Sequence, residues 1–81
     1  MRKLKEVGFK YYQPEGCATK IWYNKDTDME VIKYSKKELR DMQVPEYNQY
    51  ELIANASDYK NANVEEYFET IDELVDYLKI I

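Results

Sequence analysis

The acidic side chains near the C-terminus are the residues whose type and spacing suggest the clearest chemistry. The sequence NANVEEYFETIDELVDYLKII, residues 61–81, places six carboxylates among eleven apolar or aromatic side chains. At about 100° per residue the acids fall on one side of a helix and the apolar residues on the other. A row of carboxylates attracts a basic protein surface, and its spacing resembles that of nucleic-acid phosphates. We therefore predict a partner-binding site made of Glu65, Glu69, Asp72, Glu73 and Asp76.

A second group of residues combines aromatic rings with lysines in the N-terminal half. Alternation along the expected strands puts Trp22, Val31 and Tyr12 on one sheet face, among lysines. Rings that stack on bases, framed by cations, are how several sheet proteins hold single-stranded nucleic acids. This alternative nucleic-acid site consists of Tyr12, Lys20, Trp22 and Lys33. A helix over residues 45–57 that covered this face would instead make the rings part of the core.

Other kinds of site find little support in the residue types. The chain has no histidine, the commonest general base near neutral pH and the commonest metal ligand. Cys17 is the single cysteine and has no basic neighbour in the sequence that would activate its thiol. The segment DTDME, residues 26–30, begins like a calcium loop, but Val31 stands where such a loop needs glycine. We predict no catalytic residue, no cofactor and no metal site.

The N-terminal half is expected to form a small sheet. Gly8 would end any preceding helix, and FKYY at 9–12 is typical of a strand. TKIWYN at 19–24 and MEVIKYS at 29–35 predict a hairpin joined by the polar loop at 25–28. Together they predict a three-stranded antiparallel meander. We assign one face to the core, with Phe9, Tyr11, Ile21, Tyr23, Ile32 and Tyr34.

The central residues predict one or two short helices. Ser35 with Glu38 three positions later forms a capping box, which indicates a helix over about 36–42 that ends before Val44-Pro45. For residues 45–57, Pro45 and the run ELIANA favour a helix. The alternation of Tyr50, Leu52, Ala54 and Ala56 would suit a strand instead. We favour the helix and keep the strand as its alternative.

The C-terminal residues predict one long amphipathic helix packed on the sheet. Asn63 is a capping residue before Val64, and the apolar stripe continues for about 17 residues. Ile71, Leu74 and Leu78 on that stripe are expected to be structural. In a rival interpretation Thr70 caps a shorter helix that begins at Ile71, and EEYFE before it is a strand or loop. The unbroken stripe favours the longer helix.

Length and charge limit the class of protein. With 81 residues, we expect a single domain, 1–81, of the α+β class with a small core. Residues 1–40 carry ten Lys or Arg and six Asp or Glu, whereas residues 41–81 carry two and ten, so that only the second half is strongly acidic. We expect a cytoplasmic protein, because no apolar run is long enough for a signal peptide or a membrane span.

These observations predict a small non-enzymatic protein-interaction module. Its acidic C-terminal helix would bind a basic protein surface, as an inhibitor or nucleic-acid mimic from a phage or mobile element would do. Single-stranded nucleic-acid binding is the alternative, although overall acidity counts against it. Self-association into a homodimer, or a purely structural role, is a further alternative because two apolar sheet faces need cover.

Overall fold

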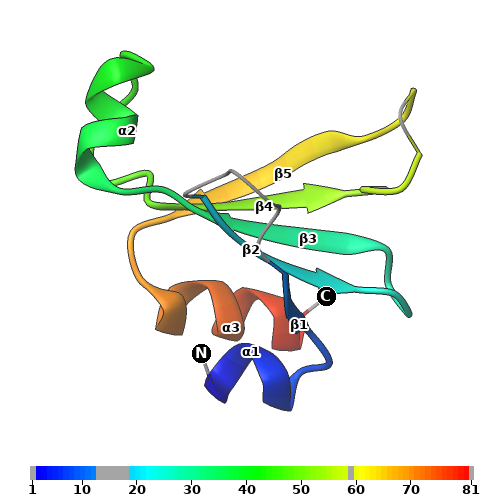
Figure 1. Ribbon diagram of the computed structural model, residues 1–81. Coiled ribbons are helices and arrows are strands. Elements are labelled where there is room, and N and C mark those ends of the chain that lie inside the picture. Colours follow the sequence, from blue (N-terminus) through cyan, green and yellow to red (C-terminus); the bar gives the residue numbers. More distant parts are fainter. Residues whose placement is uncertain (1, 13–18, 59, 81) are drawn as a thin grey trace.

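A five-stranded antiparallel sheet forms the centre of the molecule. The computed structural model describes residues 2–12, 19–58 and 60–80. The strands follow one another in chain order as a simple meander, so that β1 and β5 are its two edges (Figure 1). Their bounds are β1 Lys10–Tyr12, β2 Lys20–Asn24, β3 Met29–Lys33, β4 Tyr50–Ala54 and β5 Asn63–Phe68. The predicted meander is thus correct for its three strands but lacks two, because residues 50–54 and 63–68 were both expected to be helical.

Two helices cover one face of this sheet. Helices α1, Arg2–Glu6, and α3, Ile71–Ile80, lie side by side on the same side of the sheet, whereas α2, Lys36–Asp41, projects beyond its other face (Figure 1). The core between sheet and helices contains ten buried residues: Leu4, Phe9, Trp22, Met29, Val31, Tyr50, Leu52, Phe68, Leu74 and Val75. The fold therefore belongs to the expected α+β class, with a helix at its C-terminal end.

On β2 and β3 the two sheet faces are the reverse of the prediction. Trp22 is 2% exposed and Val31 is fully buried beneath the helices, although both were expected on the outer face. Ile21 and Ile32 pair with each other on the opposite face and are only half-buried. Of the six residues predicted to form the core, Phe9 alone is in it. Alternation within β2 and β3 was interpreted correctly, but it does not indicate which face the helices cover. The faces of β1 were matched wrongly to those of β2, because Tyr11 pairs with Trp22 and Tyr12 pairs with Ile21.

The turn after α1 has a close backbone contact that fixes how the helix meets the sheet. Gly8 has φ +95°, a conformation that favours glycine, and a Cβ at this position would lie 2.9 Å from Asn24 Nδ2. Buried Asn24 donates from Nδ2 to the Val7 carbonyl at 3.1 Å, and its Oδ1 accepts from the Asp26 amide at 2.9 Å. The amide side chain thereby joins the end of α1 to the β2–β3 turn.

The predicted short helix is confirmed, and the one predicted after it is wrong. Ser35 Oγ accepts from the Glu38 amide at 3.1 Å, and Glu38 Oε1 accepts from the Ser35 amide at 2.9 Å, which completes the capping box. Residues 45–57 contain β4 instead of a helix, with Tyr50 and Leu52 facing the core. Tertiary pairing with β3 and β5 outweighs the helical propensity of ELIANA.

The long C-terminal helix is also wrong, and its rival interpretation is the correct one. Asn63–Phe68 is strand β5, and α3 begins only at Ile71. The Thr70 hydroxyl oxygen accepts from the Glu73 amide at 3.3 Å, as an N-cap residue does. Of the three residues predicted to be structural, Leu74 is fully buried, and Ile71 and Leu78 pack against the core. Among the described residues, no helix has the length and apolar character needed to cross a membrane.

Candidate functional site

The face of the sheet opposite α1 and α3, called the distal face below, contains an unusual mixture of side chains. Strand register places two rows of residues across it. One row runs through Tyr12, Ile21, Ile32, Glu51 and Tyr67, and the other through Lys10, Tyr23, Glu30, Ile53 and Val64. Isoleucines are half-buried at the centre, where they surround two carboxylates.

Glu51 is the most enclosed of the acidic side chains described. It is only 9% exposed, and its Oε1 accepts a hydrogen bond of 3.4 Å from the Tyr34 hydroxyl. Tyr67 lies directly opposite on β5, and its pKa is raised by burial and then by the charge and hydrogen bonding of Glu51. Burial followed by the charge of Glu51 also raises the pKa of Tyr34. Both tyrosines thus stay protonated, and Tyr34 donates to the carboxylate.

Glu30 is the second carboxylate of the distal face. It pairs with Ile53, whereas Glu51 pairs with Ile32, so the two acids are diagonal neighbours on β3 and β4. Burial raises the pKa of Glu30, and the negative charge of Glu51 adds to this effect. Two acids therefore share a partly desolvated region, in which the charged form of Glu30 is disfavoured.

Cations do not neutralise this pair. In the described part of the chain, neither Glu30 nor Glu51 has a lysine or arginine within ion-pair distance. The ion pairs that are present join Lys3 to Asp72 and Arg40 to Glu46, both at exposed positions. Moving a carboxylate out of water without a cationic partner costs free energy, so a cation supplied from outside would be favoured here.

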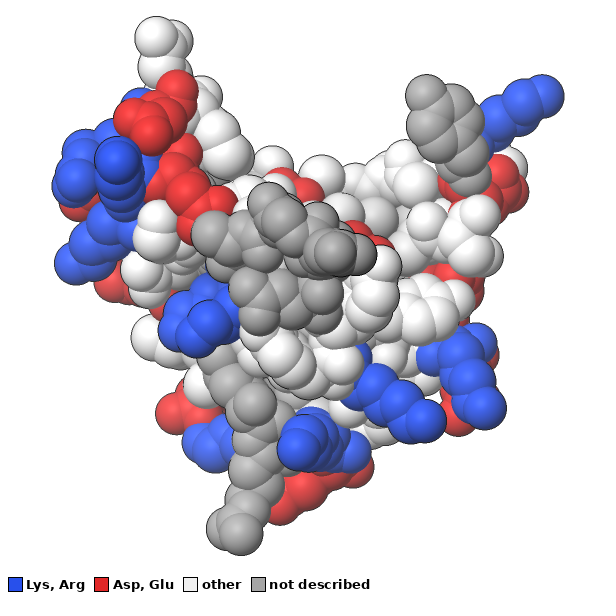
Figure 2. All heavy atoms as spheres, viewed as in Figure 1, with Lys and Arg blue, Asp and Glu red and all other residues white. Residues whose placement is uncertain are grey.

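Two projections border the distal face and make it hollow. Helix α2 rises at one end and the turn that follows β4, residues 55–58, rises at the other, with mostly uncharged atoms and a few carboxylates between them (Figure 2). Asp28 fixes the second projection in place. Its carboxylate accepts from the Tyr23 hydroxyl at 2.7 Å, from the Ser57 hydroxyl at 2.8 Å and from the Ser57 amide at 3.0 Å. These bonds lower the pKa of Asp28, with the Tyr23 hydroxyl as the largest cause.

The acids of the predicted partner-binding site do not lie on one helix face. Glu65 is in β5 and Glu69 precedes α3, whereas Asp72, Glu73 and Asp76 are in α3. Asp72 and Asp76 border α1, near Lys3. Glu65 accepts from the Tyr77 hydroxyl at 3.1 Å, and Glu69 lies near Lys36 and Tyr47. All five are exposed, but they point to different parts of the surface because β5 and α3 are separate elements.

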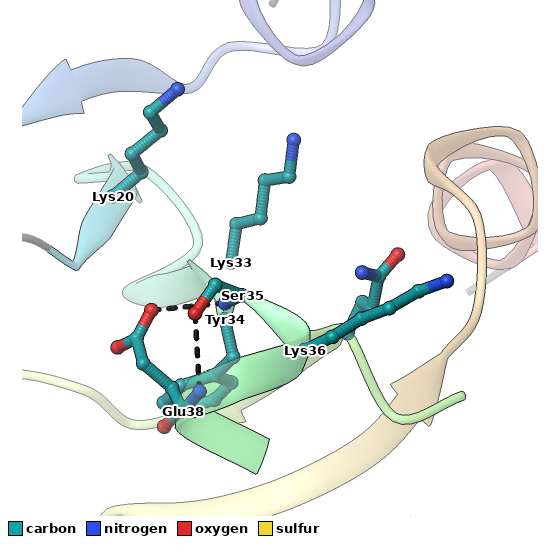
Figure 3. Close-up of a pocket in the computed structure, with 7 residues that line it drawn as sticks. Lys20, Lys33, Tyr34, Ser35, Lys36 and Glu38 are labelled. Carbon is teal, nitrogen blue, oxygen red and sulfur yellow. Dashed lines mark hydrogen bonds between the residues drawn. The ribbon is translucent and has the colours of Figure 1, made fainter. Parts of the chain in front are cut away.

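The predicted nucleic-acid site is also divided. Trp22 lies in the core, where its ring packs against Tyr11 at 5.2 Å between centroids, and Tyr12 is on the distal face. Lys20 and Lys33 stay together, because they pair directly across β2 and β3. With Lys36 they line a cavity of about 390 Å³ beside the capping box of α2 (Figure 3). The Lys33 ammonium lies 5.8 Å from the centre of the Tyr50 ring. This arrangement has cations but lacks the stacking ring of the prediction.

Sequence reasoning missed the carboxylate pair on the distal face. Glu51 was assigned to a helix, and Glu30 was considered only as part of a calcium-like loop. In the described residues, no group of three or more metal-ligating side chains is placed to hold a metal ion. Cys17 lies outside the described residues.

The chain shows no significant match to known family models, curated proteins or solved structures.

Proposed function

We propose that this protein is a small non-enzymatic interaction module that binds a basic protein surface through its distal face. The observation that supports this proposal is the pair Glu30 and Glu51, enclosed among tyrosines and isoleucines without a cation in the described residues. Apolar area would supply the binding free energy, and the two carboxylates would select for positive charge. The projections at either end would limit which shapes fit.

A second copy of this chain is a poor occupant of the distal face. The protein carries a net charge of −4 and has only two arginines, of which Arg40 is already paired with Glu46 at 3.0 Å. Two such molecules repel each other at low ionic strength. A different, positively charged protein is therefore the partner that we propose.

Nucleic-acid mimicry is a narrower form of the same function, and it is less well supported. The regular spacing that resembles phosphates required one helix to hold Glu65 and Asp76, and these residues are in different elements. The exposed acids Glu73 and Asp76 on α3 nevertheless add to the negative field around the molecule. Their contribution can be separated from that of the distal face by substitution.

The test is affinity capture from a lysate of the source cell or its host, with and without nuclease treatment, on three immobilised proteins. These are the wild type, the distal-face variant Glu30→Gln/Glu51→Gln and the charge-matched α3 variant Glu73→Gln/Asp76→Asn. We expect a basic protein that the wild type and the α3 variant retain at low salt, that the distal-face variant loses, and that high salt releases. A partner lost only by the α3 variant, or material that nuclease removes, would contradict the proposal.

A further inference from the structure

The carboxylates of the distal face are arranged for a particular kind of cation. Glu51 on β4 and Glu30 on β3 are diagonal neighbours, and the rings of Tyr34 and Tyr67 lie beside Glu51. A cationic group that entered here would meet two carboxylates along one direction and aromatic surface along another. The Tyr34 hydroxyl already donates to Glu51 Oε1, which leaves the remaining lone pairs of the carboxylates as acceptors.

Resting on the proposed function, we propose that the distal face receives an arginine side chain of the partner, with its guanidinium between Glu51 and Glu30. A guanidinium is planar, presents five N–H donors in a fixed fork and stacks on aromatic rings. It is also more weakly hydrated than an ammonium, so it loses less on entering a partly buried position. Lysine has a compact, strongly hydrated charge, which suits neither the diagonal pair nor the rings.

The half-buried isoleucines favour the same side chain. Ile21, Ile32 and Ile53 flank the two acids, so the aliphatic part of a long side chain would contact apolar surface before its charged end reached Glu51. The Tyr34 hydroxyl holds the carboxylate in place before binding, which reduces the ordering that binding requires. The face is thereby preorganised for a cation that the chain itself does not supply in its described residues.

The test compares two fluorescently labelled peptides of equal length and charge, hexa-arginine and hexa-lysine, by fluorescence anisotropy at low salt. We expect the arginine peptide to bind the wild type about tenfold more tightly, because the guanidinium can pair with both acids and contact the rings. Glu51→Gln should remove most of this difference, and Glu73→Gln, the same charge change on α3, should leave it intact. Glu30→Gln provides a second variant, and circular dichroism checks that each variant is folded.

Equal affinity for the two peptides, with both weakened by Glu51→Gln and neither by Glu73→Gln, would overturn the choice of arginine and leave the proposed function standing. Equal losses from Glu51→Gln and Glu73→Gln would overturn the site itself, since only general charge attraction would then be present. Failure of both peptides to bind the folded wild type would contradict the proposed function as well.

Discussion

The Tyr34 hydroxyl donates a hydrogen bond to Glu51 Oε1 at 3.4 Å and so joins the end of β3 to β4 on the distal face. Glu51 is almost fully enclosed, whereas most acidic residues of the protein are exposed. A buried carboxylate that lacks a cation depends on neutral donors to offset its lost hydration. Tyr34 therefore has a structural role in orienting the Glu51 carboxylate.

Removal of that donor should destabilise the fold. We expect Tyr34→Phe to lower the free energy of unfolding by about 1–2 kcal/mol, because Glu51 would lose a hydrogen-bond donor. Denaturant unfolding measures this change. Tyr12→Phe is the matched control on the same face, since Tyr12 is 59% exposed, and should change the free energy by less than about 0.5 kcal/mol. Equal effects of the two substitutions would mean that the Tyr34–Glu51 bond contributes nothing to stability.

Glu30 should make the fold less stable as the pH rises. Its pKa in the folded state is raised, so the folded state binds the proton more tightly and loses stability as the pH rises towards and through the folded pKa. The groups that face Glu30 are Glu51 on β4 and Tyr23 on β2, with Lys10 beyond Tyr23 on β1. We expect Glu30→Gln to be more stable than the wild type at pH 7, and the difference to disappear below about pH 4.

Thermal unfolding of the wild type and Glu30→Gln between pH 3 and pH 8 measures this difference. The control is Glu69→Gln, which removes an exposed carboxylate next to α3. A Glu30→Gln variant that was less stable than the wild type at pH 7 would contradict this prediction, because it would show that the folded protein favours the charged form of Glu30.

Asp28 should show the opposite pH dependence. The Tyr23 hydroxyl and then Ser57 lower its pKa in the folded state, so its contribution is present above the unfolded pKa and is lost as the pH falls through the folded one. We expect Asp28→Asn to lower the Tm at pH 7, with a smaller difference at pH 3. Faster hydrogen exchange at the Ser57 amide should accompany it. Asp26→Asn in the same turn is the control, and equal Tm changes for both would contradict the role of Asp28.

Gly8 should resist substitution by alanine. The positive φ of +95° is strained for any residue with a Cβ, and the added atom would lie 2.9 Å from Asn24 Nδ2. We expect Gly8→Ala to cost about 1–3 kcal/mol in the free energy of unfolding. Lys5→Ala, at an exposed position in α1, should stay within about 0.5 kcal/mol of the wild type. A Gly8→Ala variant as stable as the wild type would show that the Asn24 contact adjusts freely.

Local signals in the sequence predicted the elements that depend on local contacts. Three local features were predicted correctly: the capping box at Ser35 and Glu38, the break at Gly8 and the β2–β3 hairpin. Each is determined by residues that are close together in the chain. Strands β4 and β5 were not. Tyr50–Ala54 and Asn63–Phe68 become strands by pairing with each other and with β3, and a helical stripe that continued through Val64, Tyr67 and Phe68 concealed this.

The candidate site could not be found before the register was known. Alternation shows that Ile32 and Tyr34 share a face, but Glu51 joins them only when β4 is placed beside β3. Both faces of the meander carry large apolar side chains, so patterning alone could not decide that α1 and α3 cover Trp22 rather than Ile21. The strand alternative for residues 45–57, which is the correct one, would have placed Glu51 on the other face of the sheet from Tyr50 and Leu52.

The isoleucines allow a direct test of where a basic partner binds. Ile21, Ile32 and Ile53 lie on the distal face, whereas Ile71 and Ile80 are in α3. The measurement is an NMR spectrum of isoleucine methyl groups during titration with the hexa-arginine peptide at low salt. Binding through the distal face predicts that the signals of Ile21, Ile32 and Ile53 shift while those of Ile71 and Ile80 stay in place. Shifts confined to Ile71 and Ile80 would place the binding surface on α3 and contradict the account.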